Sequence, residues 1–542
     1  MIKELSKQIK FFLSQKVYMC ILILATALGY GYAVTHSSLG VDDACIEVYF
    51  GEGLGLAIGR WPYYLLNKVL HVAEYTPWVT DFLAVLFMML AAVLWCCLLH
   101  IVIKREVQII CYAVFAAMFV DYSLIAEVFT FSLQNGVPII YCLIALVLLF
   151  LYLFLTNSKG RMERIVAILI MGTILSVAIG FYESAAGVFL TGVLIVIGAD
   201  ILAENALGAD KVRRIVEICL FSGLLLCIVI VERSIINSVL MQVFHVEPYG
   251  YRSALDFFEI IQNPGRILTI GLEILRDYVF VASRYYPIKI FLVATVICVA
   301  ASIYATFKKR KITPLLVGVL LYASLFLLSL FQGGSMPYRS AQGISVFVSV
   351  MLFMLCVWAS EKHCIVKLFS WGVSGILIFN SAVDLNQWFV FEYEKNQKEL
   401  QVVDSIMLDL EQIGYEPYTK PLVFIGEYQF DDWIIDSHSI QNGHVGYWNV
   451  RKINDYLGIE PYYRYSFVDT LDNSVLSWGI SGLHEYAGYN SMMYWLFRHC
   501  GYEISVGTDE DYLWAQELLY EMPDYPVEGY IREYADCIVI KL

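Results

Sequence analysis

Charged residues are scarce in this sequence, and they are unevenly placed. Only 16% of the 542 residues are charged, whereas 59% are hydrophobic. A soluble globular chain has about 25% charged and about 45–50% apolar residues, so this composition excludes an ordinary soluble protein and predicts apolar surface in contact with lipid. Apolar runs of helix-spanning length recur from Val17 to about Asp384, and no such run follows.

The sequence also lacks the patterns of several kinds of site. No CxxC pair occurs among the 13 cysteines, and His438 and His444 do not have a metal-ligand spacing, so no zinc or thioredoxin-like centre is expected. From Leu385 onward, 26 acidic residues stand against 9 Lys and Arg, which argues against nucleic acid as a partner. Cys500 and Cys537 could pair in an oxidising compartment, but spacing alone does not fix connectivity.

The apolar runs predict a polytopic α-helical membrane protein, because a helix needs about 20 apolar residues to cross a bilayer. The first run follows several lysines and continues to about Val34, too long for a signal-peptide core, so it is expected to remain as a span. Residues 266–283 are a marginal twelfth segment. About eleven spans are expected, at residues 17–36, 78–100, 107–123, 137–155, 165–182, 185–203, 215–236, 288–307, 313–331, 342–359 and 366–384.

The basic residues of the short loops predict the orientation. If eleven spans alternate, the N-terminal lysines and the loops around Lys104, Arg161, Arg213, Lys308–Lys311 and Lys362 all fall on one side. An excess of Lys and Arg marks the cytoplasmic side, so the N-terminus is expected in the cytoplasm and the C-terminus outside. Residues 1–384 then form the membrane domain. Residues 385–542 form an extracytoplasmic α/β domain, with helices expected at 402–413, 491–500 and 509–519 and strands at 421–425 and 537–542.

Acidic residues at the outer ends of the spans are the main functional candidates, because charges at a membrane are costly. Asp42 and Asp43 follow the first span directly. Two adjacent carboxylates repel each other unless a cation, a hydroxyl or a substrate compensates. The alternative is that one of them is the N-cap of a helix continuing through Glu47, and both roles can coexist. Glu127 and Glu183 lie in apolar surroundings, whereas Asp121 is expected to be an ordinary solvated loop residue.

Several cations are expected on the same outer side, against the usual charge bias. Some of them can form ion pairs with the acids. Others can lie at helix ends and extend their charged groups to the membrane surface. Arg339 has few acids near it in sequence, which makes it the preferred anion ligand, and Arg284 is a second candidate. The planar guanidinium fork suits a phosphate group.

With these residues in view, the chain resembles the membrane glucosyltransferase family of bacterial O-antigen serotype conversion. The resemblance is carried by Val41-Asp42-Asp43, Gly59-Arg60-Trp61, Tyr182-Glu183-Ser184, the Met-Pro…Pro…Gly pattern of residues 522–531, and the closing residues 539–542. It implies a GT-C-like fold and an enzyme of the bacterial plasma membrane. The implied reaction moves a hexose, glucose in that family, from a polyprenyl-phosphate donor to a cell-surface glycan at the outer face.

The resemblance also implies roles for the candidate residues. Asp42 or Asp43 would accept the proton of the attacking hydroxyl, while the other orients hydroxyls or holds Mg²⁺ or Mn²⁺; the sequence does not show that a metal is used. Arg339 and Arg284 would hold the donor phosphate. Phosphate is a weak base, so one carboxylate suffices, and attack opposite the leaving group inverts the sugar. Substrate contacts are implied for Arg60, Trp61, Glu127, Tyr182 and Glu183.

Two other functions fit the composition. A flippase or transporter of lipid-linked saccharides would also bind such donors, but the sequence shows no obvious internal repeat or pair of Gly- or Pro-broken spans. It would also leave the outer domain without a task. A non-catalytic cell-surface glycan assembly protein is compatible with everything that composition and orientation predict.

Overall fold

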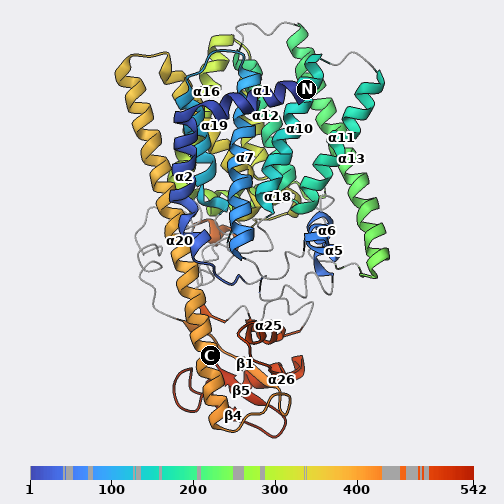
Figure 1. Ribbon diagram of the computed structural model, residues 1–542, viewed down its shortest axis with the longest axis vertical. Coiled ribbons are helices and arrows are strands. Elements are labelled where there is room, and N and C mark those ends of the chain that lie inside the picture. The colour runs from blue at the N-terminus through green and yellow to red at the C-terminus, as the bar shows by residue number, and fades with distance from the viewer. Residues whose placement is uncertain are drawn as a thin grey trace.

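The computed structural model shows a bundle of helices with a smaller domain at one end (Figure 1). One helix, α20 (Cys364–Gln412), runs along the side of the bundle and continues into this C-terminal domain. The structure describes residues 2–40, 43, 53–70, 77–125, 129, 136–157, 161–203, 209–247, 249, 262–280, 287–334, 336, 338–429, 452–458, 474–476, 479–480 and 488–542.

Within these residues, eight helices are long and apolar enough to cross a membrane. They are α2 (Lys16–Thr35), α7 (Pro77–Ile103), α10 (Val137–Asn157), α11 (Arg161–Phe181), α13 (Ala209–Phe244), α16 (Ile288–Lys309), α19 (Gly343–Ser360) and α20. Three shorter apolar helices are α8 (Ile109–Asp121), α12 (Ala185–Ala203) and α17 (Thr313–Ser324). The chain is therefore a multi-pass membrane protein, and these helices occupy the segments that hydropathy singles out.

Over its described residues, 266–280, the marginal twelfth segment does not form a further long helix. It contains α15 (Gly265–Leu275) and a π-helical turn, η3 (Arg276–Phe280). At about 1.5 Å rise per residue, α15 is far shorter than the hydrocarbon core of a bilayer, which is about 30 Å thick. The charged residues Arg266, Glu273, Arg276 and Asp277 explain why the hydropathy of this segment is low.

Burial separates central helices from peripheral ones. In α19, 78% of the apolar segment is buried, against 22% in α13 and 17% in α20. Helix α8 is buried from Cys111 to Asp121 and packs between α2 and α19. Because the exposed side chains of α13, α16 and α20 are apolar, these helices form the surface that faces lipid.

Successive helices alternate in direction, which gives the bundle two distinct ends (Figure 1). The end that carries the amphipathic helix α1 (Ile2–Ser14) is called the remote end, and the basic turns after α7, α16 and α19 lie there. The end next to the C-terminal domain is called the domain-facing end. Short elements gather at that end: α5 (Leu54–Ala57), α6 (Trp61–Leu70), η1 (Ser123–Ile125), α18 (Leu327–Gln332) and η4 (Tyr338–Ser340).

The C-terminal domain is built on a three-stranded mixed sheet of order β1-β5-β4, formed by β1 (Leu422–Ile425), β5 (Ile538–Lys541) and β4 (Ile531–Glu533). Strands β1 and β5 are parallel, and β4 is antiparallel to β5. Side chains alternate between the faces, so Leu422 and Phe424 pack on α20 and α25 (Ser491–His499), while Val423 packs toward α26 (Asp509–Ala515). A second, two-stranded sheet pairs β2 (Tyr428–Gln429) with β3 (Ser474–Val475), and η5 (Gln516–Tyr520) follows α26.

Helix α20 joins the two parts without a break. Residue 385, where the apolar character ends, lies inside this helix, and its last turns bury Val402, Ile406 and Leu410 in the core of the C-terminal domain.

Cys500 and Cys537 both carry free thiols and belong to different hydrophobic clusters. The structure therefore has no disulfide between them.

Candidate active site at the domain-facing end

Asp43 is helical and lies eight residues after the end of α2. The Gly40 backbone N–H donates to Oδ2 of Asp43 at 3.1 Å, and the Asp43 backbone N–H donates to the Gly40 carbonyl at 3.0 Å. Only 2% of Asp43 is exposed. Asp42 and the helix expected to continue through Glu47 lie outside the described residues, so the helix-cap alternative stays open.

The chain between α2 and Asp43 is anchored in both parts of the molecule. Leu39 is buried in the hydrophobic core of the C-terminal domain, together with Ile406 of α20 and Phe424 of β1. Four residues earlier the chain is still in α2, which belongs to the core of the bundle. Asp43 therefore lies close to the junction of bundle and domain.

A small polar pocket opens beside the same segment. It is lined by His36, Ser37 and Ser38 from the chain after α2, and by Asp81 from the first turns of α7. Asp81 is only 6% exposed. Its position inside an expected span was a signal of function that the sequence analysis did not use. The Asp81 carboxylate thus lies beside the segment that leads to Asp43.

The expectation that Asp121 is a solvated loop residue is wrong. It is the last residue of α8, it is 1% exposed, and neither carboxylate oxygen has a hydrogen-bond partner within the described part of the chain. Its backbone carbonyl accepts from Ser381 Oγ of α20 at 2.6 Å. A Cβ added to Gly29 of α2 would lie 2.5 Å from Asp121 Oδ1, so this glycine makes room for the carboxylate. An isolated buried carboxylate is costly and is a further functional candidate.

Residues of the Gly59-Arg60-Trp61 segment and of the Tyr182-Glu183 tip lie close together. They form a second group of candidate residues, besides Asp43. The Arg60 guanidinium lies 4.8 Å from the centre of the Tyr182 ring, in a cation–π contact. Trp61 is buried against Gly180, where an added Cβ would lie 2.9 Å from Trp61 Nε1. The sequence predicted that these residues act at one site, and the fold places the described ones in contact.

Arg233 completes this second group and was not predicted. Its Nη2 donates to Glu183 Oε1 at 2.7 Å and lies 3.5 Å from the Gly59 carbonyl oxygen. Both members of the Arg233–Glu183 pair are about one third exposed or less. Arg233 stands in the long apolar helix α13, where a charge is itself a signal. Arg233 therefore links the tip that carries Glu183 to helix α13.

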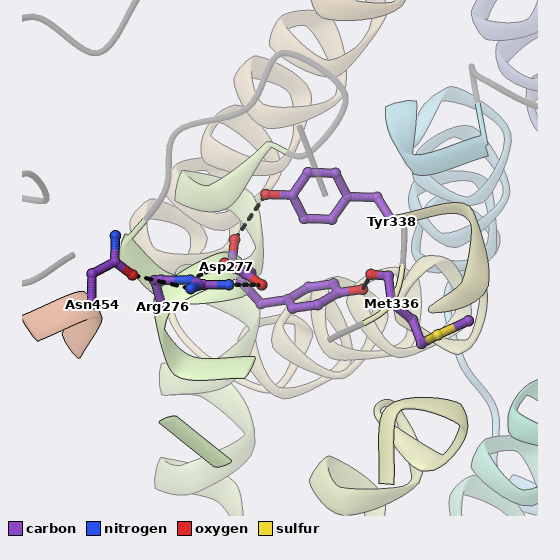
Figure 2. Close-up of polar contacts among 6 residues, drawn as sticks. Arg276, Asp277, Met336, Tyr338 and Asn454 are labelled. Atoms are coloured by element: carbon purple, nitrogen blue, oxygen red, sulfur yellow. Dashed lines mark hydrogen bonds and ion pairs between the residues drawn. The ribbon is translucent and has the colours of Figure 1, made fainter. Parts of the chain in front are cut away.

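Arg339 lies in η4, a short turn that is anchored to η3 (Figure 2). The Tyr338 hydroxyl donates to the Asp277 carbonyl at 2.8 Å, and the Tyr278 hydroxyl donates to the Met336 carbonyl at 3.0 Å. The two tyrosine rings meet edge to face, with centroids 5.1 Å apart. Arg339 is half-buried and has contacts of its own. These bonds fix the backbone on which Arg339 is presented.

A buried ion pair supports this turn. Arg276 donates to both carboxylate oxygens of Asp277, at 2.6 and 3.0 Å, and its Nη1 donates to Asn454 Oδ1 of the C-terminal domain at 3.0 Å (Figure 2). Burial alone would lower the pKa of Arg276, but the hydrogen bonds and the negative charge of Asp277 outweigh it and raise the pKa. Arg276 is therefore a charged structural link between bundle and domain.

Three predicted site residues, Asp42, Glu127 and Arg284, lie outside the described residues, as do His438 and His444. Over the described ranges, no cluster of three or more His, Cys, Asp or Glu side chains is arranged to hold a metal ion. The placed candidates are Asp43, Arg60, Trp61, Tyr182, Glu183 and Arg339. Asp81, Asp121 and Arg233 join them from the structure.

Comparison with known proteins adds a family. No match was found among functionally curated proteins. A crystal structure of the Archaeoglobus fulgidus oligosaccharyltransferase, tethered with an acceptor peptide, is similar over 78% of this chain, with 9% sequence identity and a TM-score of 0.36. The similarity covers 63% of that oligosaccharyltransferase, so this chain spans less than two thirds of its length.

A family model described as "Glucosyl transferase GtrII" matches residues 31–405, more than two thirds of the chain. The matched region begins in α2 and ends in α20. It includes Asp43, the group of Arg60, Trp61, Tyr182, Glu183 and Arg233, and Arg339. The resemblance drawn from the sequence motifs is confirmed by this match. The chain therefore belongs to the glucosyl transferase GtrII family of glycosyltransferases.

Proposed function

We propose that the protein transfers a hexose, glucose by its family, from a polyprenyl-phosphate donor to a cell-surface glycan. The observation that carries the proposal is the position of Asp43. Its carboxylate is buried close to where the membrane helices meet the C-terminal domain, in a chain whose family transfers sugars. A lipid-linked donor reaches this junction from the bilayer, and a glycan acceptor reaches it from the aqueous side.

The orientation follows from the two ends of the bundle. The turns at the remote end carry the basic residues, including Lys308–Lys311, and the positive-inside rule puts such turns in the cytoplasm. The N-terminus is then cytoplasmic, and the C-terminal domain lies outside the plasma membrane of a bacterial cell. We keep residues 1–384 as the membrane-embedded catalytic part and 385–542 as the outer domain, with α20 as their common element.

The proposed step is a direct displacement at the anomeric carbon. The acceptor hydroxyl attacks C1 of the sugar, its proton passes to the Asp43 carboxylate, and the C1–O bond breaks with its electron pair on the phosphate oxygen. Proton acceptance by a positioned carboxylate contributes about 10²–10⁴-fold in rate. Attack from the side opposite the phosphate inverts the configuration at C1. Asp42 shares the candidacy for this role, because it is adjacent in sequence.

Cationic groups have a separate task in this step. Phosphate leaves without protonation, but its developing charge needs fixed positive charge nearby. Arg339 suits this role, because the backbone of its turn is held in place by the Tyr338–Asp277 hydrogen bond and the Arg276–Asp277 ion pair. Arg284 is a second phosphate ligand in this proposal. Arg60, Trp61, Tyr182, Glu183 and Glu127 orient the sugars.

Purified protein supplied with a polyprenyl-phosphate hexose tests the proposal. A transferase releases free polyprenyl phosphate and lengthens the acceptor by one hexose, in equal amounts, and both products are measurable by mass spectrometry. A flippase moves the donor across a vesicle membrane without releasing lipid phosphate. A surface assembly protein does neither. Either of the latter results would contradict the proposed function.

A further inference from the structure

A polar groove lies between α13 and the chain around α5 (Figure 1). One wall is the end of α5 with Gly59 after it, and the other is a face of α13 that carries Arg233, Ser234, Asn237 and Ser238. This groove, called the α13 groove, has a volume of about 410 Å³. Small-ligand pockets have about 300–1,000 Å³. The proposed reaction gives no task to any of these four α13 side chains.

The α13 groove lies at the membrane surface on the domain-facing side. At about 1.5 Å per residue, Arg214 and Arg233 are about 28 Å apart along α13. This distance matches the hydrocarbon core of a bilayer, which is about 30 Å thick. Helix α13 continues beyond Arg233 to Phe244, so Asn237 and Ser238 lie outside the hydrocarbon, where a hydrophilic ligand can reach them.

The two walls of the groove are held together at Gly59. Arg233 Nη2 donates to Glu183 Oε1 and lies 3.5 Å from the Gly59 carbonyl oxygen. Gly59 has a φ of +86°, and a Cβ there would lie 2.8 Å from Arg233 Nη2, so only glycine allows this approach. Trp61 is buried beside the groove in a cluster that also includes Met241 of α13. The groove is therefore a preformed feature of the fold.

The groove has no surplus of charge. Among its described lining residues Arg233 is the only charged one, and Glu183 balances it at 2.7 Å. The neighbouring Glu232 accepts a hydrogen bond from α11, and Arg60 places its guanidinium over the Tyr182 ring. A phosphate or another anion thus gains little from this groove, whereas an uncharged polar ligand is compatible with it.

The polar atoms of the groove are a mixture of donors and acceptors. The Arg233 guanidinium only donates, whereas the hydroxyls of Ser234 and Ser238 can do both. Asn237 Nδ2 donates to the thioether of Met241 at 3.1 Å, and its Oδ1 is buried and accepts no hydrogen bond from the described part of the chain. A ligand that donates to this oxygen removes the cost of leaving it unpaired. Sugar hydroxyls donate and accept in the same way, so a saccharide fits this pattern.

The groove is close to Arg339 but separated from it by a helix. Glu183 directly precedes the first turn of α12, and a Cβ on Gly343, the first residue of α19, would lie 3.6 Å from the Gly187 carbonyl oxygen of α12. Arg339 comes one turn before Gly343. Because α12 packs against both α13 and α19, and packed helix axes are about 8–10 Å apart, a ligand in the groove lies about one helix away from a phosphate at Arg339.

We propose that the α13 groove binds an uncharged sugar unit of the acceptor glycan. Arg233 and the Ser234 and Ser238 hydroxyls would donate to the sugar, and Asn237 Oδ1 would accept from it. The separation from Arg339 favours the acceptor over the donor, whose hexose is bonded directly to its phosphate. The inference rests on the proposed function, because it takes the ligand from the acceptor side of that reaction.

Binding of polysaccharide in the absence of donor tests this inference. The full-length protein is purified in a polyoxyethylene detergent, whose headgroup carries no sugar. It is titrated calorimetrically with cell-surface polysaccharide released from host cells in which the gene is deleted. Ser238→Phe fills the groove and should abolish binding. Val239→Phe places the same ring at the next position, which is exposed and does not line the groove, and it should bind like the wild type.

A milder pair of variants keeps the groove open. Asn237→Leu should weaken polysaccharide binding about 5-fold, the factor that corresponds to one neutral hydrogen bond of about 1 kcal/mol. Gln242→Leu makes a similar change at an exposed position of the same helix outside the groove, and it should bind like the wild type. No binding by the wild type, or equal binding by the wild type, Ser238→Phe and Asn237→Leu, would overturn the inference.

A titration with polyprenyl-phosphate glucose separates the two sources of sugar. Ser238→Phe should retain the wild-type affinity for this donor, and a loss of donor affinity would overturn the assignment to the acceptor. Failure of the proposed function has a different result. A wild type that binds polysaccharide in the groove but transfers no hexose contradicts the reaction and supports the groove, whereas a wild type that transfers hexose while Ser238→Phe binds polysaccharide normally contradicts the groove alone.

Discussion

Removing the negative charge of Asp277 should cost the protein more stability than removing a carboxylate from any exposed ion pair. The Asp277 side chain is fully buried and that of Arg276 is 6% exposed. Asp277→Asn keeps the shape but leaves the Arg276 guanidinium buried without a counter-charge. Breaking a buried pair in this way costs about 3–5 kcal/mol.

The chain contains a matched control for this prediction. Arg105 and Glu361 form an ion pair of nearly the same length, 2.7 Å, but their side chains are 46% and 59% exposed. Glu361→Gln should therefore cost only about 0–1 kcal/mol, because water and side-chain freedom replace most of the attraction. The two substitutions remove the same chemical group and differ in burial.

The free energy of unfolding is measured for both variants in mixed micelles with increasing sodium dodecyl sulfate, followed by circular dichroism. Asp277→Asn should shift the midpoint to much lower denaturant, and Glu361→Gln should leave it nearly unchanged. Replacing both Arg276 and Asp277 by apolar residues of similar size should recover much of the loss, because no buried charge remains. If Asp277→Asn and Glu361→Gln lose the same amount, the η3 pair is not the buried link described here.

Three further predictions concern other described contacts. Gly29→Ala should lower the free energy of unfolding by about 1–3 kcal/mol, because its Cβ would lie 2.5 Å from Asp121 Oδ1. Gly31→Ala on the same helix meets nothing within 4 Å and should not lower it, and thermal unfolding of the two variants tests the difference. Asp121→Asn should keep or raise the unfolding temperature, since it replaces a buried carboxylate whose oxygens have no partner within the described residues; a lower temperature would contradict this. Burial, and then the hydrogen bond and charge of Asp409, raise the pKa of Tyr530 well above its usual value. The folded protein thus keeps this proton where the unfolded chain releases it, so stability should fall as the pH rises above about 10, and Tyr530→Phe should flatten that fall in pH-dependent unfolding curves.

The bundle was largely predictable because each long helix carries its own signal. Every apolar segment proposed from hydropathy contains a helix, and β1 and β5 lie in the two segments expected to be strands. The continuation of α20 was predicted only as a separate helix, since the apolar run stops at 384. The intervening residues are helical because Leu385, Trp388 and Asn396 are buried along one side, which hydropathy averaged over a window cannot detect.

The site was less predictable because its geometry joins distant segments. The motifs identified Asp43, Arg60, Trp61, Tyr182 and Glu183, and the structure brings the last four together. The partner of Glu183 could not be predicted from the sequence, because Arg233 lies fifty residues away on another helix. Asp121 was interpreted as solvated because it stands at the end of a span, where the packing of α2 and α20 against α8 decides its burial.

Turnover of Asp43→Asn tests the central claim most directly. The variant is compared with Asp536→Asn, the same change at an exposed loop residue of the C-terminal domain, in the transfer of hexose from polyprenyl phosphate to acceptor. The account predicts that Asp43→Asn lowers kcat by about 10²–10⁴-fold with little change in donor KM, while Asp536→Asn remains fully active. Wild-type turnover by a correctly folded Asp43→Asn protein would contradict the claim that this carboxylate accepts the proton.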